Sequence, residues 1–180
     1  PHPYIIQVSG EIGSSFDVAS LQEIQLVLSN GISPQRMIFA NTIKRKKGIR
    51  YAKENGINRM TYDNFDEVGK IARVFPEASV ILRIKTPSVG SRINLSYKFG
   101  AEPTEALDLL LKAQDAGLNP IGISFHVGSP CNNIENYIAS LKLVVEIFEQ
   151  AATMGIELKT IDIGGGFPLQ VYQSQNNEVS

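Results

Sequence analysis

The chain alternates between short apolar runs and longer segments whose apolar residues recur at helical spacing. Runs such as VILRI and IGISF are apolar almost without interruption, which is typical of parallel strands buried on both faces. Such runs predict strands over residues 15–19, 37–40, 59–62, 79–85, 120–126 and 160–163. Because amphipathic helical segments separate them, the pattern predicts an α/β protein with a parallel sheet.

Start and stop signals mark the predicted helices. Ser20-Leu-Gln-Glu23 is a capping box, and Asn64 precedes a helical run with Glu67 at its third position. The longest helix is predicted over about residues 134–154. Glycines follow several helical runs, where a left-handed residue commonly ends a helix. These glycines are Gly31, Gly56, Gly117 and Gly155.

Two architectures fit six such strand and helix units. One is an open, doubly wound parallel sheet, and the other is part of a (β/α)8 barrel. A complete barrel takes about 250 residues, whereas this chain has 180. Six units of a barrel would form an incomplete arc with unpaired edges. Length alone therefore favours the open sheet, which is complete at this size.

Composition narrows the class of function. The 17 Lys and Arg residues almost balance the 18 Asp and Glu residues, so no basic excess exists to bind nucleic acid or an anionic membrane surface. A single cysteine excludes an intrachain disulfide, and the acidic and histidine residues lack metal-ligand spacing. No apolar run approaches the roughly 18 residues of a membrane span, and the first residues do not resemble a signal peptide. We therefore expect a cytoplasmic protein without a nucleic-acid, membrane or metal partner.

The charged run Lys44-Arg-Lys-Lys47 fits this balanced composition. Basic residues at the beginning of a helical segment usually form a solvated face. We expect all four side chains to be exposed at the start of a helix.

The strongest local signal is Asp162-Ile-Gly-Gly-Gly-Phe-Pro168, directly after a predicted strand. Three consecutive glycines let the backbone approach an anion and direct successive N–H groups at it. The segment lacks the Gly-Lys-Ser/Thr of a P-loop and the spacing of a dinucleotide-binding loop. It therefore indicates a phosphate site, with a tight strand-to-helix turn as the alternative.

A second signal, Ser124-Phe-His-Val-Gly-Ser129, also ends an apolar strand. Ligands collect at the carboxyl ends of strands in α/β sheets and barrels. His126 could lay its ring against a flat ligand, with the Ser129 hydroxyl on a phosphate. A core histidine that donates to a backbone carbonyl is the alternative.

Isolated charges in or beside apolar strands are further candidates. Arg83 interrupts a strand, and a buried guanidinium must either be paired or bind an anion. A bound anion and a structural salt bridge both remain open for it. Asp17 places a carboxylate at a strand end, where it could partner a cation. Cys131 has no evident orienting partner in the sequence and is not expected to be a nucleophile.

Seven segments together resemble the ornithine decarboxylase family, the alanine-racemase-like (fold type III) class of decarboxylases that depend on pyridoxal 5'-phosphate (PLP). They follow the family's order along nearly the whole chain up to Pro168. The segments are Ser15-Phe-Asp-Val-Ala-Ser20, Ile38-Phe-Ala-Asn41, Met60-Thr-Tyr-Asp63, Leu82-Arg-Ile84, Lys98-Phe-Gly100, Ser124-Phe-His-Val-Gly-Ser129 and Asp162-Ile-Gly-Gly-Gly-Phe-Pro168. Phe-Pro after the glycines is closer to ornithine-type enzymes than to the diaminopimelate or biosynthetic arginine branches.

The resemblance implies a different fold from the one that length favours. The family's catalytic domain is a (β/α)8 TIM barrel, followed by a β-domain. Residues 1–169 would then form a partial PLP-binding barrel domain with the family's strands two to seven. Residues 170–180 are expected to be a polar tail or the start of the next loop, and the β-domain is expected to be absent.

The resemblance also implies roles, position by position. Gly164, Gly165, Gly166 and Ser129 match residues that hold the cofactor phosphate, and His126 matches the residue stacked on the pyridine ring. Arg83 matches an arginine beside the cofactor, and Asp17 matches a carboxylate near the Schiff-base lysine. Asp162 is expected to orient the glycine loop. Lys98 and Asp63 match positions near the family's dimer interface.

The activity implied by the resemblance is decarboxylation of a basic amino acid by a homodimer, foremost L-ornithine to putrescine in polyamine biosynthesis. Lysine, arginine or diaminopimelate are alternative substrates. The Schiff-base lysine would precede Pro1, and the family's Glu-Pro-Gly-Arg and Cys-Asp motifs are also absent from the sequence. The 180 residues alone are therefore expected to be inactive. A non-catalytic binding module, as in antizyme inhibitors, is the second hypothesis, and an open-sheet protein that binds a phosphorylated small molecule is the third.

Overall fold

A single parallel sheet organises the chain. The structure, a computed structural model, describes residues 2–89 and 98–168. Its strands are β1 (Phe16–Val18), β2 (Met37–Phe39), β3 (Arg59–Tyr62), β4 (Ser79–Arg83), β5 (Asn119–Ser124) and β6 (Thr160–Asp162). The α-helices are α1 (Pro3–Glu11), α2 (Leu21–Ser29), α3 (Lys46–Glu54), α4 (Phe65–Val74), α5 (Ala106–Asp115) and α6 (Ile134–Thr153), with 3-10 turns at Pro34–Arg36 and Pro103–Glu105. The predicted tail, residues 170–180, lies outside the described residues.

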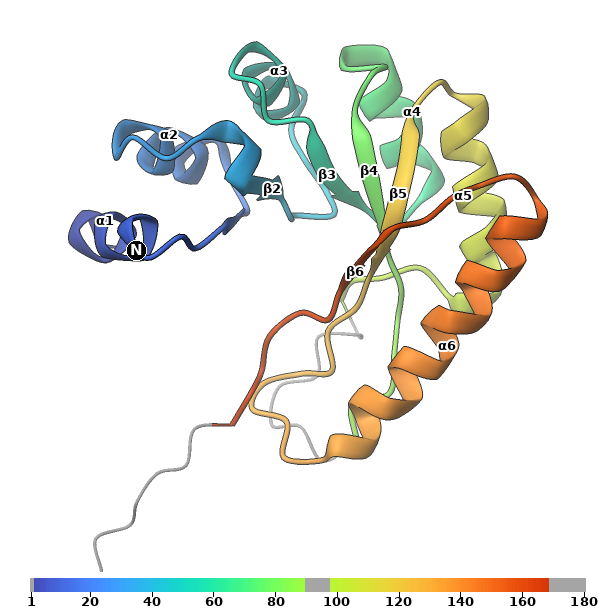
Figure 1. The fold of residues 1–180 in the computed structure, drawn as a ribbon. Coiled ribbons are helices and arrows are strands. Elements are labelled where there is room, and N and C mark those ends of the chain that lie inside the picture. The colour runs from blue at the N-terminus through green and yellow to red at the C-terminus, as the bar shows by residue number, and fades with distance from the viewer. Residues whose placement is uncertain (1, 90–97, 169–180) are drawn as a thin grey trace, which may run out of the picture.

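The strand order decides between the two architectures. Each strand pairs in parallel with the next along the chain, in the order β1-β2-β3-β4-β5-β6. A doubly wound sheet reverses its strand order at a switch point and carries helices on both faces. Here consecutive helices contact one another and lie along the outer side of a curved sheet (Figure 1). The fold is an incomplete (β/α)8 barrel, so the open-sheet alternative was wrong.

The apolar runs located the strands correctly. All six predicted strands are present, and each observed strand begins and ends within two residues of its predicted bounds. Ser20 caps α2 by accepting the Glu23 N–H at 3.2 Å, while the Glu23 carboxylate accepts the Ala19 N–H at 2.6 Å. Asn64 caps α4 by accepting the Glu67 N–H at 2.9 Å. Local sequence signals therefore set where these helices begin.

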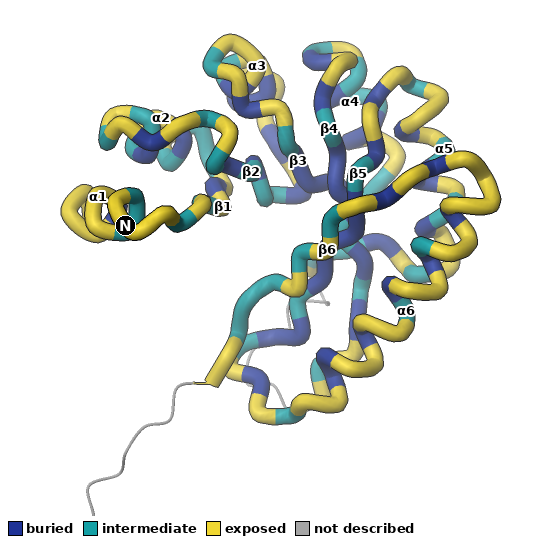
Figure 2. Tube along the Cα trace, viewed as in Figure 1, coloured by how far each residue is buried: buried dark blue, intermediate teal, exposed yellow. Residues whose placement is uncertain are grey.

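The hydrophobic core fills the space between the sheet and its helices. Buried positions lie in β1 to β5 and on the inner sides of the helices, while the outer helix faces are exposed and β6, at the edge of the sheet, has no buried residue (Figure 2). Ile24 of α2, Ile49 of α3, Val68 of α4 and Leu110 of α5 are all fully buried on the inner helix faces.

Helix α1 precedes β1 and has no counterpart among the predicted elements. His2 caps it, because its Nδ1 accepts the Tyr4 N–H at 3.2 Å. Only Ile6 of its apolar residues is buried, and Ile5 and Val8 are exposed. A helix without a continuous buried face has no clear apolar period, which explains why the sequence did not reveal it. None of the helices within the described residues is long and apolar enough to cross a membrane.

The charged run at residues 44–47 differs from its prediction. Helix α3 does begin there, at Lys46, and the side chains of Arg45, Lys46 and Lys47 are exposed. Lys44, in contrast, is buried, with its ammonium group 2.9 Å from the Glu67 carboxylate. The expectation of four solvated side chains was wrong for Lys44, because a buried carboxylate compensates its charge.

Candidate functional site

The predicted site residues lie at the carboxyl ends of four strands. Asp17 is in β1, Arg83 ends β4, His126 and Ser129 follow β5, and Gly164–Gly166 follow β6. Because parallel strands direct their carboxyl ends to one rim, the fold brings these groups to the same side of the arc. The structure therefore assembles residues that are up to 149 positions apart in the sequence.

The glycine loop after β6 is built so that only glycine fits at two of its positions. Gly164 and Gly166 have φ angles of 67° and 89°, in the left-handed region. A Cβ atom on Gly166 would overlap the carbonyl oxygen of Gly128, and one on Gly164 would lie 2.5 Å from the carbonyl oxygen of Phe125. The loop is therefore packed closely against the loop after β5.

Two backbone donors of this loop are unused. Within the described residues, the N–H groups of Gly165 and Gly166 donate to no protein acceptor. Successive unpaired N–H groups in a left-handed loop form a concave anion site. The loop therefore has the geometry of a phosphate site rather than that of a turn alone.

Asp162 orients the glycine loop, as expected. Its Oδ1 atom accepts the Gly164 N–H at 2.8 Å, and its Oδ2 atom accepts the Ser124 hydroxyl at 2.9 Å. One carboxylate thus joins the ends of β5 and β6 to the first glycine.

The far side of the loop is held by residues that the sequence did not single out for this role. The Cys131 N–H donates to the Gly166 carbonyl at 2.8 Å, and the Tyr137 hydroxyl donates to the Gly165 carbonyl at 3.1 Å. The Tyr137 ring stacks on Phe167, with centroids 5.4 Å apart. Cys131 is buried and contributes to this packing through its backbone. That it is not a nucleophile stays a prediction.

His126 packs against the glycine loop after β6. Its Nδ1 atom accepts the Gly128 N–H at 3.0 Å, so Nε2 carries the proton of the neutral ring. A Cβ atom on Gly165 would lie 3.6 Å from Nε2. Burial and the Arg83 charge lower the pKa of His126, while Asp162 acts in the opposite direction. The lowered pKa favours the neutral ring, which accepts rather than donates a hydrogen bond at Nδ1, unlike a core histidine that donates to a backbone carbonyl.

Ser129 lies in the loop that packs on the glycines. Its neighbours along the chain, Gly128 and Cys131, both contact Gly166. Ser129 itself is half-buried. Its predicted place beside the anion site is therefore consistent with the backbone.

Arg83 is half-buried and forms no ion pair with any described residue. Its guanidinium carbon lies 5.2 Å from the ring centroid of Phe99, a cation–π distance. Burial lowers the pKa of Arg83, against the attraction of Asp63 and Asp162. The salt-bridge alternative is not observed, and the guanidinium is available to an anionic ligand. Phe99 was not predicted, because only the fold brings it to Arg83.

Asp17 and Arg83 line one cavity of about 250 Å³ on the concave side of the sheet. Ala40, Asn41 and Thr42 of the loop after β2 form another part of its wall. Burial and the nearby Asp162 carboxylate raise the pKa of Asp17. The cavity therefore combines a cation with a carboxyl group of increased basicity.

The two residues predicted near a dimer interface have different surroundings. Asp63 accepts the Gly100 N–H at 2.9 Å and the Asn64 side-chain amide at 2.8 Å. Lys98 is exposed. Their interface role stays a prediction. In the described part of the chain, no group of three His, Cys, Asp or Glu side chains is placed to hold a metal ion.

Comparison with known proteins agrees with this geometry. The sequence profile of the family described as "Pyridoxal-dependent decarboxylase, pyridoxal binding domain" matches residues 1–180. The chain is 41% identical to the ornithine decarboxylase of Neurospora crassa over 167 residues, 93% of this chain and 34% of that protein. It is 40% identical to antizyme inhibitor 2 of Xenopus laevis over 164 residues, 91% of this chain and 36% of that protein.

A solved structure shares both fold and sequence. The crystal structure of a mutant of SrLDC in complex with PLP superposes with a TM-score of 0.91 at 40% identity, covering 94% of this chain and 44% of that one. The chain thus spans about a third of the length of these two curated relatives and less than half of this solved structure.

Proposed function

The chain belongs to the pyridoxal-dependent decarboxylase family, whose pyridoxal binding domain matches it, and we propose that the protein carrying this chain decarboxylates a basic amino acid. L-ornithine is the proposed substrate and putrescine the product. The names of the relatives support this choice, since an ornithine decarboxylase is 41% identical to the chain. Since the chain spans only part of such relatives, activity and substrate are proposals for the whole polypeptide.

One observation carries the proposal: the glycine loop is packed against a neutral histidine ring. The unused N–H groups of Gly165 and Gly166 suit a phosphate, and the ring of His126 beside them suits a flat aromatic ligand. PLP joins both features in one small molecule. The residues present therefore fit this cofactor.

Each residue has a defined task in this proposal. Gly165 and Gly166 would donate to the phosphate, together with the Ser129 hydroxyl. Asp162 fixes the loop through its bonds to Gly164 and Ser124. His126 would stack on the pyridine ring, and its lowered pKa disfavours a second positive charge near Arg83. A positive Arg83 attracts the anionic groups of the cofactor or the substrate.

Asp17 is placed to accept a proton or to hold a cationic amine. Its pKa is raised by burial and by Asp162, so that it is a better proton acceptor than an ordinary aspartate. When bound, PLP supplies an electron sink for the charge that remains on the substrate carbon as carbon dioxide leaves. The family resemblance implies a Schiff-base lysine, for which the sequence has no matching position.

We also propose that the protein acts in the cytoplasm, in polyamine biosynthesis, and as a homodimer with Lys98 and Asp63 near the interface. Support for the dimer comes from the family resemblance and from the exposure of Lys98. The balanced charge of the chain supports a protein without nucleic-acid or membrane partners.

The test is an assay of the whole polypeptide, as its gene encodes it. Purified protein is mixed with PLP and with ornithine, lysine or arginine, and carbon dioxide and diamine are measured. The proposal expects PLP-dependent release of one carbon dioxide per putrescine from ornithine. Preference for lysine or arginine would correct the substrate only. Protein that binds PLP but releases no carbon dioxide from any of the three would contradict the proposed activity.

A non-catalytic binding module is the second candidate, favoured by the 40% identity to an antizyme inhibitor. It predicts no turnover and no need for an intact cofactor site. The unused donors of the glycine loop and the unpaired Arg83 favour the enzyme, because an apolar or closed rim would suffice for a scaffold. Turnover that disappears in the variant His126→Ala would exclude the module.

A further inference from the structure

Lys44 is the most deeply buried cation of the described residues. Its side chain is 0% exposed, and that of its partner Glu67 is 2% exposed. The ammonium nitrogen lies 2.9 Å from Glu67 Oε1 and donates to the carbonyl oxygens of Asn41, at 3.0 Å, and of Thr61. Its three N–H groups are therefore all engaged by the protein.

These bonds join three segments of the rim. Asn41 belongs to the loop after β2, Thr61 to the end of β3, and Glu67 to the first turn of α4. Glu67 also accepts the backbone N–H of Lys44 at 3.1 Å and pairs with Lys70. The Phe39 ring of β2 lies 5.8 Å from the ammonium group. We name this arrangement of Lys44, Glu67 and the two carbonyl groups the rim clamp.

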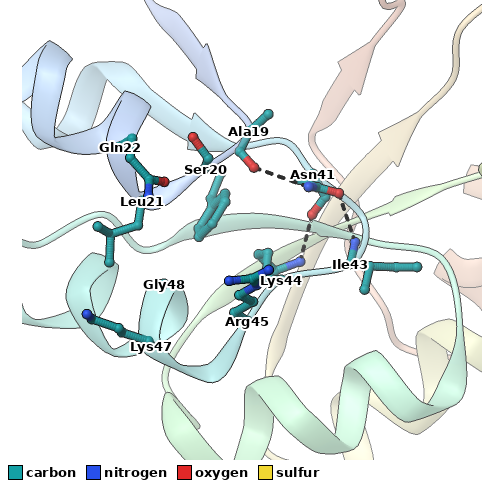
Figure 3. A pocket seen from close by; sticks show the side chains of 11 residues that line it. Ala19, Ser20, Leu21, Gln22, Asn41, Ile43, Lys44, Arg45, Lys47 and Gly48 are labelled. Atoms are coloured by element: carbon teal, nitrogen blue, oxygen red, sulfur yellow. Dashed lines mark hydrogen bonds between the residues drawn. The ribbon is translucent and has the colours of Figure 1, made fainter.

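The rim clamp connects to β1 through Asn41. Figure 3 shows Asn41 next to Lys44 at a cavity of about 470 Å³, which none of the predicted cofactor residues lines. The Asn41 side chain donates to the Ala19 carbonyl at 3.1 Å and accepts the Ile43 N–H at 3.1 Å. The Ala40 N–H donates to the Val18 carbonyl at 2.9 Å. A continuous series of bonds thus runs from Lys44 to the residues next to Asp17.

The loop after β2 also lines the cavity of about 250 Å³ that contains Asp17. Ala40, Asn41 and Thr42 line it together with Asp17 and Arg83. Thr42 is 1% exposed. Any movement of the loop after β2 would therefore change the shape of the cavity beside the Asp17 carboxylate.

Stability alone is a poor explanation for the rim clamp. Buried ion pairs can usually be replaced by apolar residues of similar volume without loss of stability, because both charges must leave water. Desolvation lowers the pKa of Lys44 to about 8, despite the opposing attraction of Glu67 and Asp63, and the like charge of Lys70 acts in the same direction as desolvation. What apolar residues could not reproduce is the hold on two backbone carbonyl groups.

We propose that Lys44 is a positioning residue, whose ammonium group holds the loop after β2 in place and thereby fixes the cavity wall beside Asp17. The inference rests on the proposed function, in which the Asp17 carboxyl group of that cavity accepts a proton or holds a cationic amine. It also separates two tasks, because the glycine loop that holds the phosphate makes no bond with the clamp. Loss of the clamp should affect turnover more than cofactor affinity.

The decisive variant is the pair K44M/E67M in the whole polypeptide, which removes both buried charges. Removing both residues together avoids leaving one buried charge without its partner. We expect its kcat to fall at least tenfold, while its affinity for PLP stays within threefold. Asn41→Ala, which introduces no buried charge, breaks the link to Ala19 and should lower kcat by at least threefold.

Tyr62→Phe is the matched control on the other side of the sheet. It removes the bond from the buried Tyr62 hydroxyl to the Leu109 carbonyl, 3.2 Å long. It should lower the unfolding temperature and leave kcat unchanged, which separates loss of stability from loss of position.

The inference is overturned if the wild type is active and both K44M/E67M and Asn41→Ala keep kcat within twofold. If K44M/E67M does not fold, Asn41→Ala alone decides. Equal losses of kcat and PLP affinity would also contradict it, because the clamp would then act on the whole barrel. An inactive wild type that binds no PLP would instead refute the proposed function, and the inference with it.

Discussion

The two ends of the rim are held in place by different means. At β5 and β6 the backbone shapes the site, with glycines in left-handed conformations, no room for a Cβ atom at Gly164 or Gly166, and N–H groups left for an anion, while the Asp162 carboxylate supports the loop from one end. At β2 and β3, one buried charged side chain holds two carbonyl groups. A backbone device leaves a visible signature in the sequence, since it requires glycine. A buried lysine, in contrast, cannot be distinguished from an exposed lysine in the sequence.

The largest effect is expected when a methyl group is added to the glycine loop, and it is an effect on the affinity for PLP. Gly166→Ala places a Cβ atom on the Gly128 carbonyl oxygen at a φ of 89°. The loop must move, and we expect the affinity for PLP to fall at least ~100-fold, or about 2.7 kcal/mol. Equilibrium dialysis of PLP against the whole polypeptide measures this change.

Gly165→Ala is the matched control within the same loop. Its Cβ atom would lie 3.6 Å from His126 Nε2, an ordinary contact, and its φ is not in the left-handed region. We expect less than a tenfold loss. Similar losses for both variants would show that the packing on Gly128 is not what shapes the site.

The second prediction concerns Lys44, at the opposite end of the rim, and the dependence of the free energy of unfolding on pH. The pKa of Lys44 is about 8 in the folded chain, against an ordinary value of 10.5. Between these values the unfolded chain holds a proton that the folded chain has lost, so stability should rise with pH across this window. The slope reaches at most about 1.4 kcal/mol per pH unit.

Comparison of the wild type with K44M/E67M isolates this contribution, because the two proteins share every other lysine, tyrosine and cysteine. Urea unfolding at intervals from pH 7.5 to 10 should show the wild type gaining stability relative to the double variant. Parallel curves, or a relative loss for the wild type, would contradict the buried, desolvated state of Lys44.

The smallest effect is expected at His126. The Asp162 carboxylate raises the pKa of this ring against burial and Arg83. Asp162→Asn should therefore lower the pKa of His126 further, because the carboxylate that favours the protonated ring is removed. NMR titration of the His126 imidazole signals in the wild type and the variant measures the change. An increase in the pKa of His126 would show that Asp162 does not act on the ring through its charge.

Secondary structure was largely predictable, because the apolar runs that form the strands are nearly unbroken and the caps at Ser20 and Asn64 are local. The arrangement of the strands was not, since length favours an open sheet over an arc with unpaired edges. Only the seven family segments pointed to the barrel. The pattern of apolar residues in a strand indicates how many of its faces are covered, but it does not indicate which strand lies next to it.

The residues of the candidate site could likewise be predicted only in part. Gly164, Gly166, His126 and Arg83 could be singled out because glycine runs and polar residues in apolar strands are unusual. Phe99 and Tyr137 could not, because they act through contacts that only the fold creates. Lys44 could not be singled out either, because its burial and that of Glu67 are created by the fold. Nothing local reveals that burial.

The most direct test of the central claim is a structure of the whole polypeptide with PLP bound. The account predicts the phosphate within about 3 Å of the N–H groups of Gly165 and Gly166, with the pyridine ring against His126. A phosphate bound instead between Arg45 and Lys47, in the cavity beside the rim clamp, would contradict it.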